Sequence, residues 1–193
     1  MLYNLQTKFM KNLISIFIML IAIVGVVNSQ SKIKGCEFSK YEVDDMTDQL
    51  VIITKRKLLK TNQLSKPSSL FSIVSSIDGR ERISFLLYRV FGGVYSIDKG
   101  DKIIIKFSDD DKVTIINDSY EIAEKAGSGA ASQWYVPYYP IVSEETLEKL
   151  KSKQITKIRL YHSDGYSEFK IKKKKKNSVV DQFGCIDLAI SSN

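Results

Sequence analysis

The sequence predicts a mainly β fold of the α+β class: a single domain of antiparallel hairpins with one or two short helices packed on the sheet. Three observations predict it. Apolar and polar residues alternate with a period of two in several segments, as in strands with one buried face. Asp-rich and Asp-Gly turns separate these segments. Only two segments have apolar residues at helical spacing, and 44% hydrophobic residues in a chain of 193 suffice for one core.

The first 29 residues have the composition of a secretory signal peptide. Residues 13–27 form an apolar run, and Lys8 and Lys11 precede it without an acidic residue. A helix of this length spans about 22 Å, less than the ~30 Å hydrocarbon core of a membrane. We expect residues 1–29 to be cleaved and residues 30–193 to form one β-rich domain without a transmembrane span, periplasmic, secreted or on the cell surface. The alternative is a short membrane anchor.

The charge and the residue types exclude several classes of protein. The net charge of +7 comes from 29 Lys+Arg and 22 Asp+Glu, and it falls by two when Lys8 and Lys11 leave with the signal peptide. This modest excess favours anionic surfaces weakly, and nucleic acid is an unlikely partner of an exported protein. One His and two Cys exclude a zinc ribbon or a Cys-ligated cluster. We therefore expect no metal ion and no cofactor.

Cys36 and Cys185 stand near the two ends of the mature chain. In an oxidising compartment two cysteines are more often paired than free, so we expect a disulfide between them. The alternative is two separate buried thiols. Neither cysteine lies in a motif of a catalytic thiol.

Turn residues predict the first two hairpins. The first has strands at 41–43 and 50–54, joined by an Asp-rich turn. The second has strands at 70–75 and 82–91, joined at Asp78-Gly79. Asp-Gly suits a type I′ turn, because both central residues need a positive φ.

Two later hairpins come with a predicted register. In the segment 102–117, a three-residue loop of Asp109, Asp110 and Asp111 places Phe107 opposite Val113. In the segment 157–171, Asp164-Gly165 forms a two-residue loop that places Leu160 opposite Phe169 and Arg159 opposite Lys170; the apolar residues share one face and the polar ones the other.

Two segments predict helices. Residues 143–150 begin with Ser143 as N-cap and have acidic residues in the first turn, where they suit the helix dipole. Leu147 and Leu150 give this helix one narrow apolar stripe. Residues 179–190 have a less regular apolar spacing that predicts a second helix.

A run of lysines is the most visible candidate site. Its members are Lys170, Lys172, Lys173, Lys174, Lys175 and Lys176. Such a cluster is typical of a patch that contacts an anionic polysaccharide, phospholipid head groups or nucleic acid. The alternative is a solvated hairpin end, where lysines prevent edge-to-edge pairing of strands.

The second candidate is an aromatic cluster. A small-residue loop at 126–132 leads into the only Trp of the chain and three tyrosines, and the cluster comprises Trp134, Tyr135, Tyr138 and Tyr139. Exposed aromatic rings can bind a sugar ring or a peptide. The alternative is that these residues fill the core. A hydrolase or inhibitor site in the region 127–140 is a further possibility.

Two other patterns predict no site. The acidic turns at 44–48 and 109–111 lack the alternate ligands, Gly and Glu of a calcium loop, and Asp is a common turn residue. His162 lies near Asp164, but no Gly-x-Ser-x-Gly nucleophile motif accompanies them. We therefore expect no catalytic residues.

Two passages carry a resemblance to a group of proteins. They are the opening Y-E-V-D-D-M-T-D at 41–48 and the passage from the 143–150 helix to the strand at 155–160. In both, the chain resembles small exported proteins of Bacteroidetes-type bacteria, which have no assigned activity. The resemblance implies export and one domain. With no catalytic residues, we expect a non-enzymatic binding or envelope-assembly module whose partner is a glycan, a peptide or an envelope protein.

Overall fold

The computed structural model describes residues 34–62, 68–89, 94–126 and 133–192. They belong to one compact unit, and the predicted signal peptide at 1–29 lies outside them. Among these residues, none of the helices has the length and the apolar character needed to cross a membrane.

The larger of two main antiparallel sheets has seven strands. Six of them follow one another in the spatial order β1 (Phe38–Val43), β2 (Leu50–Thr54), β4 (Ser68–Ile77), β5 (Arg80–Arg89), β11 (Gln133–Tyr138) and β10 (Glu124–Ala126). The seventh, β3 (Lys57–Asn62), pairs with β4 beyond the part that β2 occupies. Both hairpins predicted in the first half of the chain are therefore confirmed.

The smaller main sheet has five strands, in the spatial order β12 (Pro140–Ile141), β8 (Lys112–Asn117), β7 (Lys102–Phe107), β13 (Ile155–His162) and β14 (Gly165–Lys170). A separate two-stranded ladder joins β6 (Ser96–Ile97) to β9 (Glu121–Ile122). The mainly β fold class with packed helices is thus confirmed.

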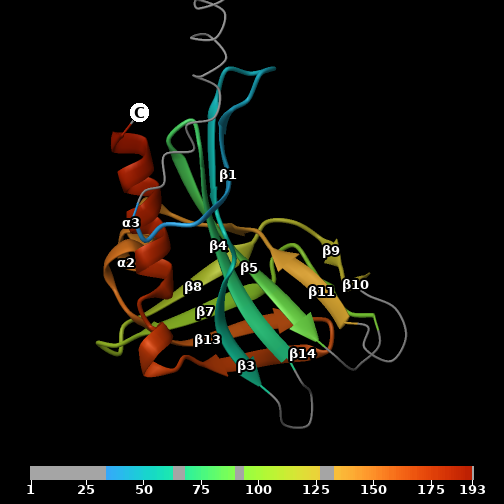
Figure 1. Cartoon of the computed structure of the whole chain (residues 1–193). Helices are drawn as coiled ribbons and strands as arrows, with labels where there is room; N and C mark the ends of the chain where they lie inside the picture. Colours follow the sequence, from blue (N-terminus) through green and yellow to red (C-terminus); the bar gives the residue numbers. More distant parts are fainter. Residues whose placement is uncertain (1–33, 63–67, 90–93, 127–132, 193) are drawn as a thin grey trace, which may run out of the picture. The chain divides into compact units, whose positions relative to one another are not determined.

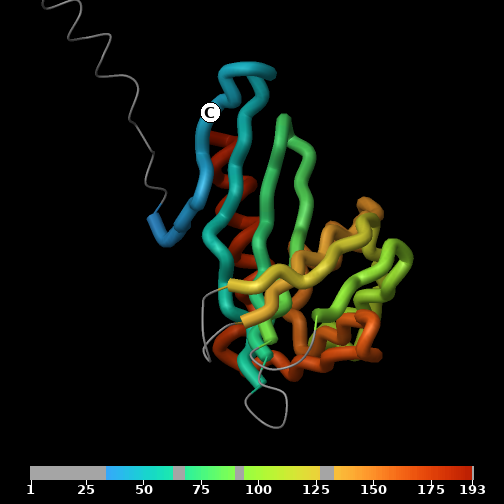
Figure 2. The backbone as a smooth tube through the Cα atoms, turned by 90° about the vertical axis from the view of Figure 1, so that its right-hand side faces the viewer, coloured from blue at the N-terminus to red at the C-terminus, as the bar shows by residue number. Residues whose placement is uncertain are grey.

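In the described part of the chain, two α-helices accompany the sheets (Figure 1). The first, α2 (Glu144–Ser152), begins where predicted, and Ser143 Oγ accepts a hydrogen bond of 3.3 Å from the Thr146 N–H. The second, α3 (Ser178–Ser191), follows a short 3-10 helix, η2 (Lys173–Lys175). It packs on β2 and β4, and α2 packs on α3. Figure 2 shows α3 in red behind these strands.

One buried cluster joins both sheets and both helices. It is apolar because alternate residues of each strand point inward, as the period-two pattern predicts. Its largest members are Tyr95, Tyr138, Phe85, Phe107, Phe169 and Phe183.

The Asp78-Gly79 turn has the predicted geometry. Asp78 and Gly79 have φ of +51° and +75°, as a type I′ turn requires. Ile77 accordingly pairs with Arg80.

The predicted register of the 102–117 hairpin is wrong by two residues. Ile105, not Phe107, lies opposite Val113. The loop starts one residue earlier than predicted, since the Phe107 N–H donates a hydrogen bond of 2.9 Å to the carbonyl of Asp111. Asp110, with φ of +67°, takes the left-handed position at the end of the loop.

The predicted register of the 157–171 hairpin is also wrong by two residues. Ile158 lies opposite Phe169, and Arg159 lies opposite Glu168 instead of Lys170. The observed register gives Arg159 an ion pair of 2.6 Å with Glu168, while Lys170 lies opposite Lys157. The loop is Ser163-Asp164, and it is held from outside the hairpin, because Ser163 Oγ accepts a hydrogen bond of 2.9 Å from the Ser96 N–H.

Cys36 and Cys185 form the predicted disulfide, with their Cα atoms 5.6 Å apart. The bond ties the segment that leads into β1 to the middle of α3. It closes a loop between residues that are 149 positions apart in the sequence.

Candidate anion-binding site

Four lysines form a row across four neighbouring strands of the five-stranded sheet. Lys112 of β8 pairs with Lys106 of β7, Lys106 pairs with Lys157 of β13, and Lys157 pairs with Lys170 of β14. Directly opposed residues share one face of a sheet, with Cβ atoms about 4.5 to 5.5 Å apart. With strands about 4.8 Å apart, this lysine row is roughly 14 Å long.

Two more cations lie on the same face. Arg159 is two residues from Lys157, Lys102 lies four residues from Lys106, and side chains two or four residues apart on a strand point the same way. The lysine row together with these two residues is referred to below as the lysine face.

Two carboxylates neutralise only part of the lysine face. Glu168 forms ion pairs of 2.6 Å with Arg159 and 3.0 Å with Lys157. Asp110 forms an ion pair of 2.5 Å with Lys106. The hydrogen bond from Arg159 is the main cause of a lowered pKa of Glu168.

The remaining three cations are unpaired. Lys102, Lys112 and Lys170 are exposed and form no ion pair with any described residue. Like charges placed opposite each other destabilise a sheet, so an anion lying along the lysine row would relieve a repulsion that Asp110 and Glu168 compensate only in part.

Tyrosines border the lysine face at the turn between β13 and β14. Tyr161 and Tyr166 pair across the two strands with ring centroids 5.8 Å apart. The Arg159 guanidinium lies 4.6 Å from the centre of the Tyr166 ring, and Tyr166 is 56% exposed. A flat group next to the cations could therefore contact an aromatic ring.

The predicted lysine run continues from the lysine face. Lys170 ends β14, and the run then passes through η2 toward α3. The run lies at the open end of the hairpin, away from the turn between β13 and β14, and it begins on the edge strand of the sheet. Lys172, Lys173 and Lys174 are exposed, and the last two lysines are partly buried.

The structure separates the four predicted aromatic residues. Tyr138 is 0% exposed, and its hydroxyl donates a hydrogen bond of 3.0 Å to the carbonyl of Tyr161. Trp134 packs against the core from the same face of β11, and Tyr139 follows the strand and is exposed. Burial of Tyr138 strongly raises its pKa.

Tyr135 lies on the opposite face of β11. Its ring stacks on that of Tyr88 with centroids 5.5 Å apart, and Tyr88 meets Phe71 edge to face at 5.4 Å. The Tyr135 hydroxyl donates a hydrogen bond to Glu124, and this hydrogen bond is the main cause of the raised pKa of Tyr135. The four aromatics therefore form no common surface, and the loop at 127–132 lies outside the described residues.

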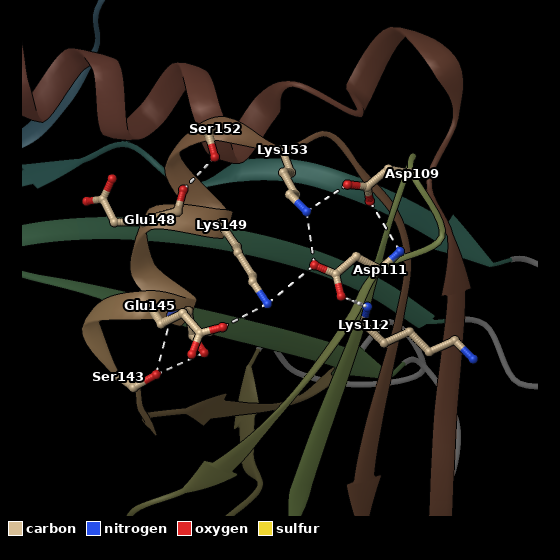
Figure 3. Close-up of polar contacts among 10 residues, drawn as sticks. Asp109, Asp111, Lys112, Ser143, Glu145, Glu148, Lys149, Ser152 and Lys153 are labelled. Atoms are coloured by element: carbon tan, nitrogen blue, oxygen red, sulfur yellow. Dashed lines mark hydrogen bonds and ion pairs between the residues drawn. The ribbon is translucent and has the colours of Figure 1, made fainter.

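Asp109 and Asp111 are bound by lysines (Figure 3). Lys153 lies 2.7 Å from Asp109 and 2.9 Å from Asp111, and Lys149 lies 3.3 Å from Asp111. These contacts join the β7–β8 loop to the end of α2. In the described part of the chain, no group of three or more His, Cys, Asp or Glu side chains is placed to hold a metal ion.

We expect this contact between loop and helix to weaken in acid. The hydrogen bond from Lys153 is the main cause of the fall in the pKa of Asp111 from 3.8 to about 2. A carboxyl with a lowered pKa in the folded chain contributes stability above its unfolded pKa and loses the contribution as the pH falls through the folded value. Urea unfolding should therefore show an Asp111→Asn variant less stable than wild type at neutral pH, with the difference vanishing near pH 2. Asp45→Asn, at an exposed position without an ion pair among the described residues, is the control variant. A difference that does not change with pH contradicts the prediction.

His162 takes part in packing. It is 7% exposed, its Nε2 lies 3.0 Å from Ser167 Oγ, and its ring meets that of Tyr95 edge to face at 5.6 Å.

The lysine row cannot be recognised from the sequence alone. Its members lie on four strands of two hairpins, and two of them, Lys106 and Lys157, are about fifty residues apart. Lys102 and Lys106 share one face of β7, which is a visible signal for a cationic face on that strand. Only the pairing of β7 with β13 joins the two hairpins into one row.

Comparison of the chain with protein-family models, with curated proteins and with solved structures finds no match.

Proposed function

We propose that the protein is an exported, non-enzymatic binding module that holds an anionic polysaccharide on the lysine face. The observation that carries the proposal is the lysine row, in which four like charges stand directly opposite one another on adjacent strands. A chain of carboxylate or sulfate groups laid across the strands would meet one ammonium group about every 4.8 Å.

Two further features support a sugar polymer over other anions. Tyr161 and Tyr166 border the cations and offer aromatic rings, which suit a sugar ring. The proposed route of export, with cleavage of residues 1–29, takes the protein to the periplasm or the cell surface, where nucleic acid is scarce. The disulfide between Cys36 and Cys185 fits such an oxidising compartment, and the resemblance to small exported bacterial proteins points the same way.

Affinity for heparin, a sulfated polysaccharide, tests the proposal. The variant replaces the lysine row by glutamine: Lys106→Gln, Lys112→Gln, Lys157→Gln and Lys170→Gln. At about 1 kcal/mol for each cation near an anionic surface, its affinity should fall roughly 100- to 1000-fold. Its melting temperature should change little, because the repulsion that the substitutions remove offsets the exposed ion pairs of Lys106 and Lys157 that they also remove.

The matched control removes the same charge elsewhere: Lys55→Gln, Lys60→Gln, Lys99→Gln and Lys125→Gln. It should keep most of the affinity. Equal losses in the two variants would overturn the proposal, as would tighter binding to anionic lipid vesicles or to a short RNA than to heparin at the same salt concentration.

A further inference from the structure

A groove of about 760 Å³ runs along α3. Three parts of the chain line it: the segment 34–37, the end of β2 with the start of β3, and the stretch from η2 through α3. Its volume lies within the range of about 300 to 1000 Å³ typical of sites for small molecules.

One end of the groove is cationic. Lys174 and Lys175 of η2 line it just before α3 begins, and neither forms an ion pair with a described residue. Lys57 also lines it and is held 3.0 Å from Glu37. Lys34 and Asp181 line the groove as well, so four lysines stand against two carboxylates in its lining. The excess of positive charge suits an anionic group.

The wall along α3 becomes apolar away from this end. The disulfide of Cys185 lies on it, followed by Leu188. Leu188 is ten residues beyond Ser178, which corresponds to about 15 Å along a helix. An apolar chain attached to the anionic group could lie along this wall.

The floor of the groove is rigid. Thr54 and Gln182 line it and are each 2% exposed. Gln182 Nε2 donates a hydrogen bond of 2.8 Å to Thr54 Oγ1, and Thr54 Oγ1 donates one of 3.0 Å to the carbonyl of Val74. These polar groups satisfy one another, so the floor is formed before any ligand arrives.

Gly184 keeps the groove open. It lies within α3 and lines the groove, and a Cβ placed on it would meet nothing within 4 Å. Glycine inside a helix is less favourable than alanine. Neither packing nor a positive φ requires a glycine here, and only a side chain much larger than that of alanine would fill the space above the helix.

We propose that this groove binds a small amphiphilic anion, a carboxylate or phosphate joined to an unbranched apolar chain. Lys174 and Lys175 hold the anionic group, and the chain lies over Gly184 toward Leu188. The groove is distinct from the lysine face, and the proposal does not depend on the polysaccharide.

Titration calorimetry with decanoate and with decyl phosphate tests the proposal and shows which head group binds more tightly. Inorganic phosphate and decanol, which carry only one of the two features, should each bind at least tenfold more weakly. The variant Gly184→Phe fills the groove and should lose binding at least tenfold, whereas Gly184→Ala should keep it and raise the melting temperature.

A matched pair of variants tests the head-group contact. Lys174→Gln/Lys175→Gln should weaken binding about tenfold or more, and Lys172→Gln/Lys173→Gln, which changes neighbouring lysines outside the groove, should not. Absence of binding to wild type, equal losses in the two lysine pairs, or full binding by a folded Gly184→Phe variant would each overturn the proposal. Heparin affinity of Gly184→Phe should equal that of wild type, which separates this test from that of the lysine face.

Discussion

A Cys36→Ser/Cys185→Ser variant is expected to melt about 10 °C or more below the wild type under oxidising conditions. The disulfide closes a loop between residues 149 positions apart, and in the chain-entropy model such a crosslink stabilises the fold by roughly 5 kcal/mol. For a domain of about this size, each kcal/mol corresponds to about 2 to 4 °C. Calorimetry of the two proteins measures the difference.

The same comparison under reductant serves as the control. Because the wild type then loses its crosslink, its melting temperature should approach that of the variant. Two free thiols titrated in the folded, non-reduced wild type would contradict the prediction, since they would show that the bond is not formed.

Replacement of Gln182 by alanine is expected to cost about 2 to 4 kcal/mol, from buried polar groups left without a partner and from the cavity. Gln182 Oε1 accepts a hydrogen bond of 2.5 Å from Ser72 Oγ, and its Nε2 lies 3.2 Å from the carbonyl oxygens of Lys55 and Ser72. These contacts join α3 to the larger sheet. Urea unfolding of the variant measures the loss.

Two further variants test whether unpaired buried polar groups cause the loss of stability. Gln49→Ala, at an exposed position, should leave stability unchanged within about 0.5 kcal/mol. Gln182→Met/Ser72→Ala removes both partners of the hydrogen bond between Gln182 and Ser72. This double variant should be more stable than Gln182→Ala, because it leaves no Ser72 hydroxyl without a partner. If Gln182→Ala unfolds like the wild type, the polar contacts at Gln182 contribute nothing to stability.

Local pattern was sufficient for the fold class, the helices and the existence of the hairpins, because alternation, caps and turn residues act within a few positions of one another. It was insufficient for two registers. At Ser163-Asp164 the turn is chosen by partners on distant strands: Arg89 binds Asp164 at 2.8 Å, and Ser96 binds Ser163. At Asp109–Asp111, Lys149 and Lys153 of the following helix hold the loop.

The candidate sites divide in the same way. The lysine run is contiguous and therefore visible in the sequence, whereas the lysine row exists only after β7 has paired with β13. The aromatic cluster is the reverse case, because its residues are neighbours in the sequence but form no common surface in the structure. Neighbours on a strand point to opposite faces, so Trp134 and Tyr135 could not form one surface. The groove along α3 depends on the disulfide and on three distant segments, which no local pattern describes.

The position of the disulfide determines how the domain responds to mechanical force. A pull applied between residue 34 and residue 192 enters the bond at Cys36 and leaves it at Cys185. The tension therefore travels through one covalent link and the last turns of α3, and residues 37–184 carry none of it. Both sheets, with the lysine face on one of them, are thereby shielded from stretching of the chain at its ends.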